Sequence, residues 1–137
     1  MPIKTILDLD NNLTIFHCSG VVRTDVLMRV IKSFHDGEPT LNTLYDLTNF
    51  SVDHLGYKDL SGWCDFLMHK VNFEQRIGGR TAIVAPTDIQ YGIARIVESL
   101  LSLRAPHEIR VFRSVSDAVK WIRETSNQVV EHFSEKS

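Results

Sequence analysis

The order of strand-like and helix-like segments is the feature that most constrains this chain of 137 residues. Two strand patterns come first, at Ile3–Leu9 and Leu13–Ser19, and the turn-forming residues between them predict an antiparallel hairpin. One helical pattern and then three strand–helix pairs follow. This alternation predicts a single α/β domain with right-handed crossovers, in which four helices cover a mainly parallel sheet of five strands.

Three further strands are predicted in the second part of this order, at Leu41–Thr48, Thr81–Ala85 and Glu108–Arg113. Thr81–Ala85 is apolar without alternation, as expected of a strand that is covered on both faces. We therefore place it near the centre of the sheet.

Four segments have apolar residues at helical spacing. We expect the first helix to begin after an N-cap at Thr24, the second near Tyr57, the third at Thr87 and the fourth after an N-cap at Ser116. The third should end near Leu103. The apolar residues expected to face inward on the second and fourth helices are Leu60, Trp63, Cys64, Leu67 and Val71, then Ala118, Val119, Ile122 and Val129.

Composition excludes several classes of protein. A net charge of −2 with interspersed signs provides no basic surface for nucleic acid. No apolar run approaches membrane-spanning length and the start lacks a signal peptide, so we expect a cytoplasmic protein without stable membrane association. Cys18 and Cys64 are far apart, which favours reduced thiols over a disulfide or zinc site. We expect one domain over residues 1–137, with 134–137 fraying.

Three segments resemble the STAS domains (sulfate transporter and anti-sigma factor antagonist), and more closely their SpoIIAA-like bacterial relatives. They are LYDLTNFS (Leu44–Ser51), GGRTAIVAPTDIQYGIAR (Gly78–Arg95) and RVFRSVSDAVKWI (Arg110–Ile122). The resemblance covers nearly the whole chain. It implies a SpoIIAA-like fold and a regulatory role through binding of proteins.

The phosphorylation switch of the antagonist branch does not transfer to this chain. That branch has an Asp-Ser-Ser-Gly-Leu corner, whereas the corresponding region here is VDHLG, with His54 and Leu55 in place of the serines. Ser51 and Ser61 lie nearby but outside the motif position. We therefore expect neither to be a phosphate switch, and alanine at either position to leave binding unchanged.

The proline-threonine-aspartate corner before the third helix is interpreted as a cap. It lacks the glycines and lysine of a phosphate-binding loop, and Asp88 in the first turn would repel an anion. We expect Thr87 to be the N-cap.

The third helix offers one candidate surface. We expect its apolar arc, formed by Ile89, Ile93, Ile96, Val97 and Leu100, to face inward, with Asp88, Tyr91, Arg95 and Glu98 nearly opposite. Tyr91 and Arg95 would then form an outward patch for a partner. The alternative is an ordinary solvated face with weak ion pairs.

A second candidate surface consists of Phe66 and Phe73, which lie off the apolar stripe of the second helix. We expect them to form a patch for a partner or a homodimer of moderate affinity, which Phe66→Asp or Phe73→Asp would disrupt. Packing against the chain's own loops is the alternative.

No catalytic or metal site is predicted. The six histidines lack ligand spacing to Cys, Glu or one another, and no cofactor motif is present. Ser61, His54 and Asp53 would form a triad only if folding assembled them. Asp46, at the end of a strand, is the most plausible polar group of any pocket, unless it binds a helix N-terminus.

The leading hypothesis is a small non-enzymatic STAS-like module that binds a protein partner, as yet unknown, or itself. The alternative is a small-molecule or lipid-binding module, since the resemblance extends loosely to CRAL-TRIO lipid carriers; an enzyme ranks third. A large apolar cavity beneath the second and third helices would favour the alternative. A solid core with Phe66, Phe73 or Tyr91 exposed would favour the leading hypothesis.

Overall fold

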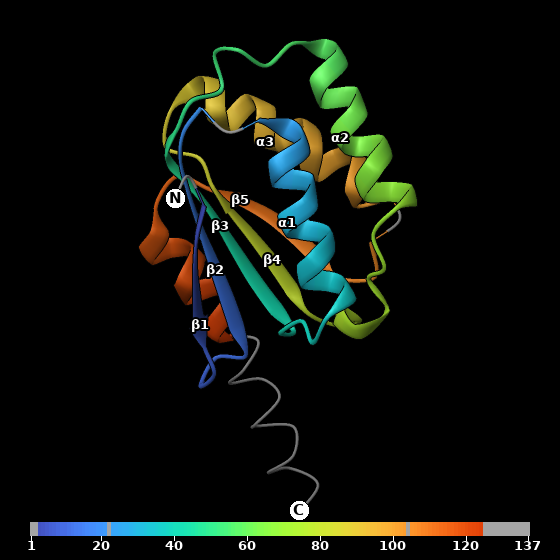
Figure 1. Cartoon of the computed structure of the whole chain (residues 1–137). Helices are drawn as coiled ribbons and strands as arrows, with labels where there is room; N and C mark the ends of the chain where they lie inside the picture. Colours follow the sequence, from blue (N-terminus) through green and yellow to red (C-terminus); the bar gives the residue numbers. More distant parts are fainter. Residues whose placement is uncertain (1–2, 22, 104, 125–137) are drawn as a thin grey trace, which may run out of the picture.

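The computed structural model describes residues 3–21, 23–103 and 105–124. Its elements follow the predicted order (Figure 1). They are β1 (Ile3–Asp8), β2 (Leu13–Gly20), α1 (Thr24–Asp36), β3 (Asn42–Phe50), α2 (Tyr57–His69), the 3-10 helix η1 (Glu74–Arg76), β4 (Arg80–Val84), α3 (Asp88–Leu101) and β5 (Glu108–Phe112). Residues 115–124 are also helical.

The five strands form one sheet in the order β1-β2-β3-β4-β5. β1 pairs with β2 antiparallel, and each of the other neighbouring pairs is parallel. α1, α2 and α3 cover one face of the sheet, and the helix of residues 115–124 covers the other (Figure 1). The expected fold class is therefore confirmed: a mainly parallel five-stranded sheet with an N-terminal hairpin and four helices.

Burial on both faces makes β3 and β4 the centre of the molecule. Leu44 of β3 and Ala82 of β4 face the helix of residues 115–124 and are fully buried, together with Ala118 and Ile122 of that helix. The opposite face packs against the apolar sides of α1, α2 and α3. The absence of alternation in β4 follows from this double cover.

Two of the three expected N-caps are wrong. Thr24 is the first residue of α1, its N-cap is Arg23, and no side chain caps that end. In the last helix, Ser114 rather than Ser116 has the capping role, since its Oγ accepts the amide of Asp117 at 3.3 Å. Val129 and the tail 134–137 lie outside the described residues.

The third expected cap, Thr87, is confirmed, and with it the interpretation of the proline-threonine-aspartate corner as a helix cap. Thr87 Oγ1 accepts the amide of Gln90, and the Gln90 amide oxygen accepts the amide of Thr87, which completes a capping box. The Gln90 Nε2 group also donates to the carbonyls of Leu47 at 2.7 Å and Phe50 at 3.0 Å. Together these hydrogen bonds of Thr87 and Gln90, which we call the Gln90 clasp, fix the start of α3 to the end of β3.

Because of this clasp, α3 is rotated about its axis relative to the predicted orientation. Gln90 is turned into the protein, so the buried face contains the residues spaced from it by whole helical turns. These are Gln90, Ala94, Val97 and Leu101. Of the expected inward arc, Ile89, Ile96 and Leu100 are 61%, 48% and 38% exposed. They form an apolar stripe on the surface. On α2, Trp63, Cys64 and Leu67 pack into the core as expected, whereas Leu60 is only partly buried and Val71 packs against the core from beyond the end of the helix.

Candidate functional site

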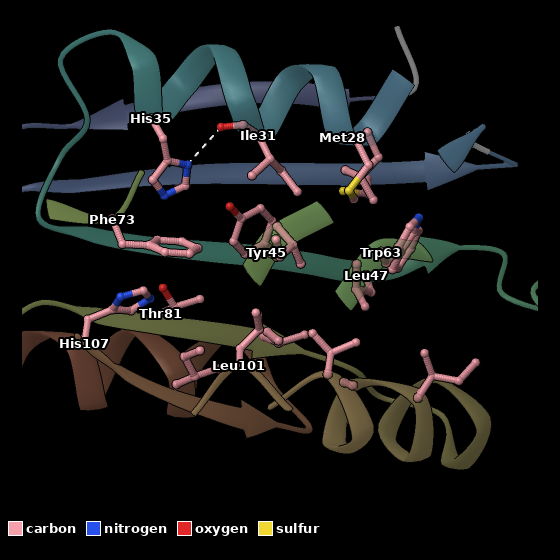
Figure 2. A pocket seen from close by; sticks show the side chains of 18 of the residues that line it. Met28, Ile31, His35, Tyr45, Leu47, Trp63, Phe73, Thr81, Leu101 and His107 are labelled. Atoms are coloured by element: carbon pink, nitrogen blue, oxygen red, sulfur yellow. Dashed lines mark hydrogen bonds between the residues drawn. The ribbon is translucent and has the colours of Figure 1, made fainter. Parts of the chain in front are cut away.

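An apolar cavity of about 100 Å³ lies between the sheet and α1, α2 and α3. Its wall is contributed by side chains from every one of these elements, and Figure 2 shows how they converge on the space. Among them are Met28 and Ile31 of α1, Tyr45 and Leu47 of β3, Trp63 and Leu67 of α2, Ile83 of β4, and Ala94 and Val97 of α3.

Arg76 lines one end of this cavity and is 1% exposed. Its Nε donates to the Leu41 carbonyl (3.2 Å), and its Nη2 donates to the Arg80 carbonyl (3.3 Å) and to Thr81 Oγ1 (2.8 Å). Among the described residues, no carboxylate forms an ion pair with it. Burial lowers the Arg76 pKa to about 10, so the guanidinium is still a cation at neutral pH.

Two buried histidines complete this polar end. His35 Nδ1 donates to the Ile31 carbonyl at 2.9 Å, so its Nε2 accepts from Arg76 Nη1 at 3.3 Å. His107 is 8% exposed, and its Nδ1 has no hydrogen-bond partner among the described residues. Burial, and then the nearby Arg76 cation, lower the pKa of His35 to about 4 and that of His107 to about 3. Both imidazoles are therefore neutral at physiological pH.

The ring of Phe73 packs between these imidazoles. Its centroid lies 5.0 Å from that of His35 and 5.3 Å from that of His107. At the other end of the cavity Trp63 stands beside Met28 and Leu47, away from Phe73 and His107 (Figure 2). The Trp63 Nε1 group is buried and, like His107 Nδ1, has no partner in the part of the chain that the structure describes. Each of these two residues lines one end of the apolar space.

A close backbone approach positions Arg76. Gly79 passes so near to residue 41 that a Cβ at this position would lie 2.0 Å from the Leu41 carbonyl oxygen. The Gly79 amide donates to the Arg76 carbonyl at 3.0 Å, which closes the turn after η1. Gly78, with φ of +82°, supplies the left-handed conformation in that turn. The same Leu41 oxygen accepts from Arg76, so the turn and the buried cation are built together.

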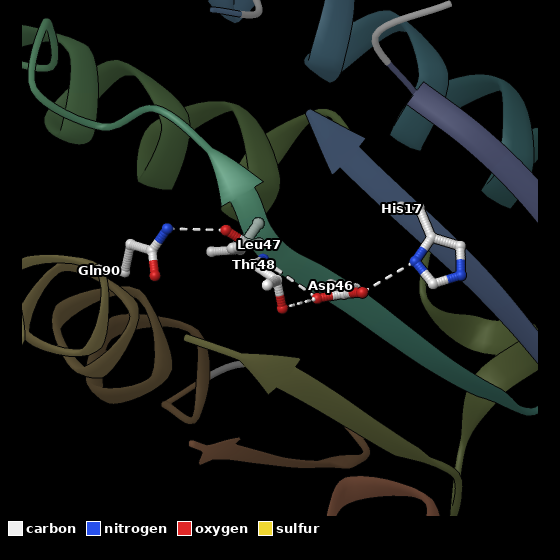
Figure 3. Close-up of polar contacts among 5 residues, drawn as sticks. All are labelled: His17, Asp46, Leu47, Thr48 and Gln90. Atoms are coloured by element: carbon white, nitrogen blue, oxygen red, sulfur yellow. Dashed lines mark hydrogen bonds and ion pairs between the residues drawn. The ribbon is translucent and has the colours of Figure 1, made fainter. Parts of the chain in front are cut away.

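Asp46 does not line the cavity, because it points to the other face of β3. Its carboxylate accepts from the Thr48 amide at 3.0 Å and lies 2.8 Å from His17 Nδ1 (Figure 3). Burial raises the Asp46 pKa, but the bonds from Thr48 and His17 outweigh it and hold the pKa below its ordinary value. The carboxylate therefore fixes its own strand end and His17, and among the described residues it bonds no helix N-terminus.

The two predicted phenylalanines are separated in the structure. Phe66 of α2 is partly buried and lines a groove between α1 and α2. Phe73 lies beyond the end of α2, in the wall of the cavity. They do not share one face of a helix, as the sequence had suggested. Phe73 packs against loops and side chains of its own chain, which is the alternative considered for it.

The predicted pair on α3 is also rearranged. The ring of Tyr91 is partly buried and lies 4.1 Å from the guanidinium carbon of Arg113. Arg95 pairs instead with Glu98, at 2.9 Å. Tyr91 and Arg95 therefore have separate partners, which is closer to the ordinary solvated face than to a joint patch. Their use as a partner surface stays a prediction.

Ser61, His54 and Asp53 are all exposed, and among the described residues no hydrogen bond joins them. Cys18 and Cys64 are buried free thiols, as expected, and burial raises the Cys18 pKa to about 12. In the described ranges, no three His, Cys, Asp or Glu side chains gather as metal ligands would. The helices described are also too short or too polar to cross a membrane.

Comparison with known proteins shows likeness at the level of structure. No family model and no curated protein sequence matches the chain. The NMR structure of the protein TM1081 superposes with a TM-score of 0.52 at 13% identity, over 89% of this chain and 87% of that one. An anti-sigma factor antagonist from Mycobacterium paratuberculosis gives 0.48 at 18% identity, over 88% and 94%. The chain shares its fold with TM1081, and its topology is that implied by the STAS resemblance.

Proposed function

We propose that this chain is a non-enzymatic binding module whose ligand is a small molecule held in the apolar cavity between the sheet and α1, α2 and α3. The observation behind the proposal is the apolar space itself, about 100 Å³ of open volume lined by side chains of the sheet and of all three helices. Its lining is apolar over almost its whole surface, as is typical of sites that take an apolar ligand.

The cavity itself supports this function. At about 24 cal/mol per Å³, a space of about 100 Å³ costs about 2.4 kcal/mol of stability relative to a filled core. Apolar cavities of this order stay dry and accept small apolar molecules. Ala94 and Val97, which line the space, are ordinary core residues, and larger apolar residues at such positions would fill it. The fold itself therefore does not require the cavity.

A second candidate is the regulatory, protein-binding role implied by the STAS resemblance. It is favoured by the exposed stripe of α3, where Ile89, Ile96 and Leu100 leave three aliphatic side chains in water. Such patches on small domains are commonly contact sites. A protein partner, or a second copy of the chain, would cover the stripe. The cytoplasmic location expected from the sequence is part of this second proposal.

The two functions separate in one pair of experiments. Xenon, dissolved under pressure in a solution of isotope-labelled protein, should shift the methyl signals of Ile83, Ile93 and Val97 saturably while leaving those of Ile89 and Ile96 in place. Ile96→Asp should abolish association in sedimentation if α3 is the interface, and should not alter xenon binding. Absence of any saturable methyl shift would refute the cavity as the binding site and leave the α3 surface as the candidate.

A further inference from the structure

We propose that a second copy of this chain docks on the free edge of β1, with its own β1 antiparallel, so that the two sheets join into one. This inference is independent of the cavity. It begins from the sheet order, in which β1 is an outer strand and pairs only with β2 (Figure 1). It places the homodimer that was expected from the sequence on a surface other than the two predicted phenylalanines.

The two edges of the sheet differ in how they are covered. At the edge formed by β5, the backbone amide of Val111 donates to the carboxylate of Glu98 in α3, at 3.1 Å. At the edge formed by β1, no side chain of the described residues bonds the backbone of residues 3–7. An outer strand without such cover presents a row of N–H and C=O groups to any strand that lies beside it. The edge of β1 is therefore open to pairing.

The side chains of this edge strand favour a strand as the occupant. Ile6 and Leu7 are 38% and 58% exposed, and as neighbours in a strand they point to opposite faces of the sheet. Leu9, in the turn that follows, is 75% exposed. A strand laid beside β1 would cover Ile6 and Leu7 together, whereas a helix packed on one face would cover only one of them.

The charges of β1 indicate that the occupant is a second β1. Among the described residues, neither Lys4 nor Asp8 forms an ion pair. Four residues of extended strand separate them by about 13 Å, too far for a pair within one copy. In an antiparallel pair centred on Ile6, Lys4 of each copy lies directly opposite Asp8 of the other, and opposite charges at such positions stabilise the pair.

The same register matches the other side chains of the strand. It places Ile6 against Ile6 at the two-fold axis and Thr5 against Leu7, so that one interface is used identically by both copies. A shift of two residues in either direction would put Lys4 or Asp8 opposite Ile6 of the other copy. The sequence of β1 therefore specifies one register, as a pairing strand requires.

The size of the interface sets its strength. A pair of six-residue strands covers less than the about 800 Å² per partner of a standard interface, so we expect a reversible dimer with a Kd of about 10 to 100 µM. The opposing interpretation is that Lys4 keeps the edge strand from pairing. The chain would then be monomeric, and reversing the charge of Lys4 would not weaken any association.

Charge reversal tests the pairing of the full chain. Sedimentation at low salt, from about 5 to about 500 µM, gives the Kd. We expect Lys4→Asp to weaken the dimer at least about tenfold, because both symmetry-related pairs become repulsive, and Lys4→Asp combined with Asp8→Lys to restore it. Lys58→Asp is the matched control, since Lys58 is exposed on α2, outside β1, and its reversal should leave the Kd unchanged. A monomeric wild type at about 500 µM overturns the proposal, as does a double variant that is folded by circular dichroism and associates no better than Lys4→Asp.

A disulfide across the axis tests the register and decides the question if the double variant does not fold. Ile6 of each copy faces its counterpart, with about 5 Å between the Cβ atoms, so Ile6→Cys should form a covalent dimer under mild oxidation. Lys4→Cys is the control, because Lys4 is also exposed but lies about 13 Å from its counterpart, and the native Cys18 and Cys64 are buried. Ile6→Cys should react at least about tenfold faster than Lys4→Cys; equal rates contradict the register.

A last variant separates β1 from the apolar stripe of α3. Ile96→Asp should leave both the dimer and the disulfide of Ile6→Cys intact, because residue 96 lies on α3 and not at the edge of β1. The α3 stripe would then be free for a different protein. If Ile96→Asp abolishes the dimer, the second copy binds at α3 and the proposal is wrong.

Discussion

Filling the cavity from α3 should stabilise the protein and abolish its binding of small molecules. Ala94 is 2% exposed and lines the cavity, and methionine is a good helix former whose flexible chain adapts to irregular spaces. We expect Ala94→Met to place its added atoms in the open volume. The variant thus tests whether the space is real without disturbing the polar groups at its ends.

The magnitude follows from the size of the side chain. Methionine adds three heavy atoms to alanine, and at about 0.8 kcal/mol for each buried methylene equivalent the gross gain is about 2.4 kcal/mol. Fixing the methionine rotamers costs about 1.5 kcal/mol. The net gain should be about 1 kcal/mol in the free energy of unfolding, within the about 2.4 kcal/mol that the cavity costs.

Urea denaturation measures the gain, and xenon titration by NMR measures the loss of binding. Ala118→Met is the matched control, because Ala118 is fully buried in the second core, on the other face of the sheet and outside the cavity. There the larger side chain should overpack and destabilise by about 1 to 3 kcal/mol. If Ala94→Met destabilises the protein as much as Ala118→Met does, the space beside α3 is already filled and the reasoning fails.

Three other perturbations test the elements that position the site. Gly79→Ala would force a Cβ onto the Leu41 carbonyl oxygen, 2.0 Å away, and should cost about 3 kcal/mol in urea denaturation; a loss below about 1 kcal/mol would contradict the close approach. Gln90→Ala leaves two β3 carbonyls without their donor and should cost about 2 kcal/mol, with α3 amides exchanging faster; unchanged exchange would mean that the clasp is dispensable. Acidification should also destabilise the fold, since His35 and His107 have folded pKa values of about 4 and about 3 but bind protons near 6.5 when unfolded. Their contribution is complete above pH 6.5 and is lost as the pH falls toward these folded values, by about 1.4 kcal/mol per pH unit for each imidazole. Thermal melts at pH 7 and 5.5 measure it, and equal melting temperatures would refute the buried neutral state.

The strands and helices were predictable because each depends on local pattern. The alternation of segments placed all five strands to within about two residues at each end. The Thr87 cap was recognisable for the same reason, since its partners lie within one helical turn. The misplaced caps at Thr24 and Ser116 show the limit of the method. Each has a capping-type residue near the helix start, and only the backbone path decides which residue occupies the N-cap.

The orientation of α3 could not be read from its apolar residues alone. Its isoleucines define a plausible inward arc, but the buried Gln90 anchors the helix to β3 and rotates that arc toward solvent. A glutamine in the first turn of a helix is usually counted as a surface residue. The sequence pattern therefore did not predict its long-range hydrogen bonds to the carbonyls of residues 47 and 50. A tertiary contact therefore outweighs the hydrophobic pattern of the helix.

The candidate site was missed for a related reason. Arg76 is an arginine in a short polar segment, and its burial requires residue 41, η1 and β4 to meet. Phe73 was assigned to the wrong surface because the end of α2 at His69 turns the chain toward His35 and His107 before the ring is reached. The sequence contained all of these residues, but their chemistry arises only from long-range packing. A cavity wall built from several elements is thus a signal that only the folded chain shows, and here Trp63 and His107, which are far apart in the sequence, line the two ends of the same space.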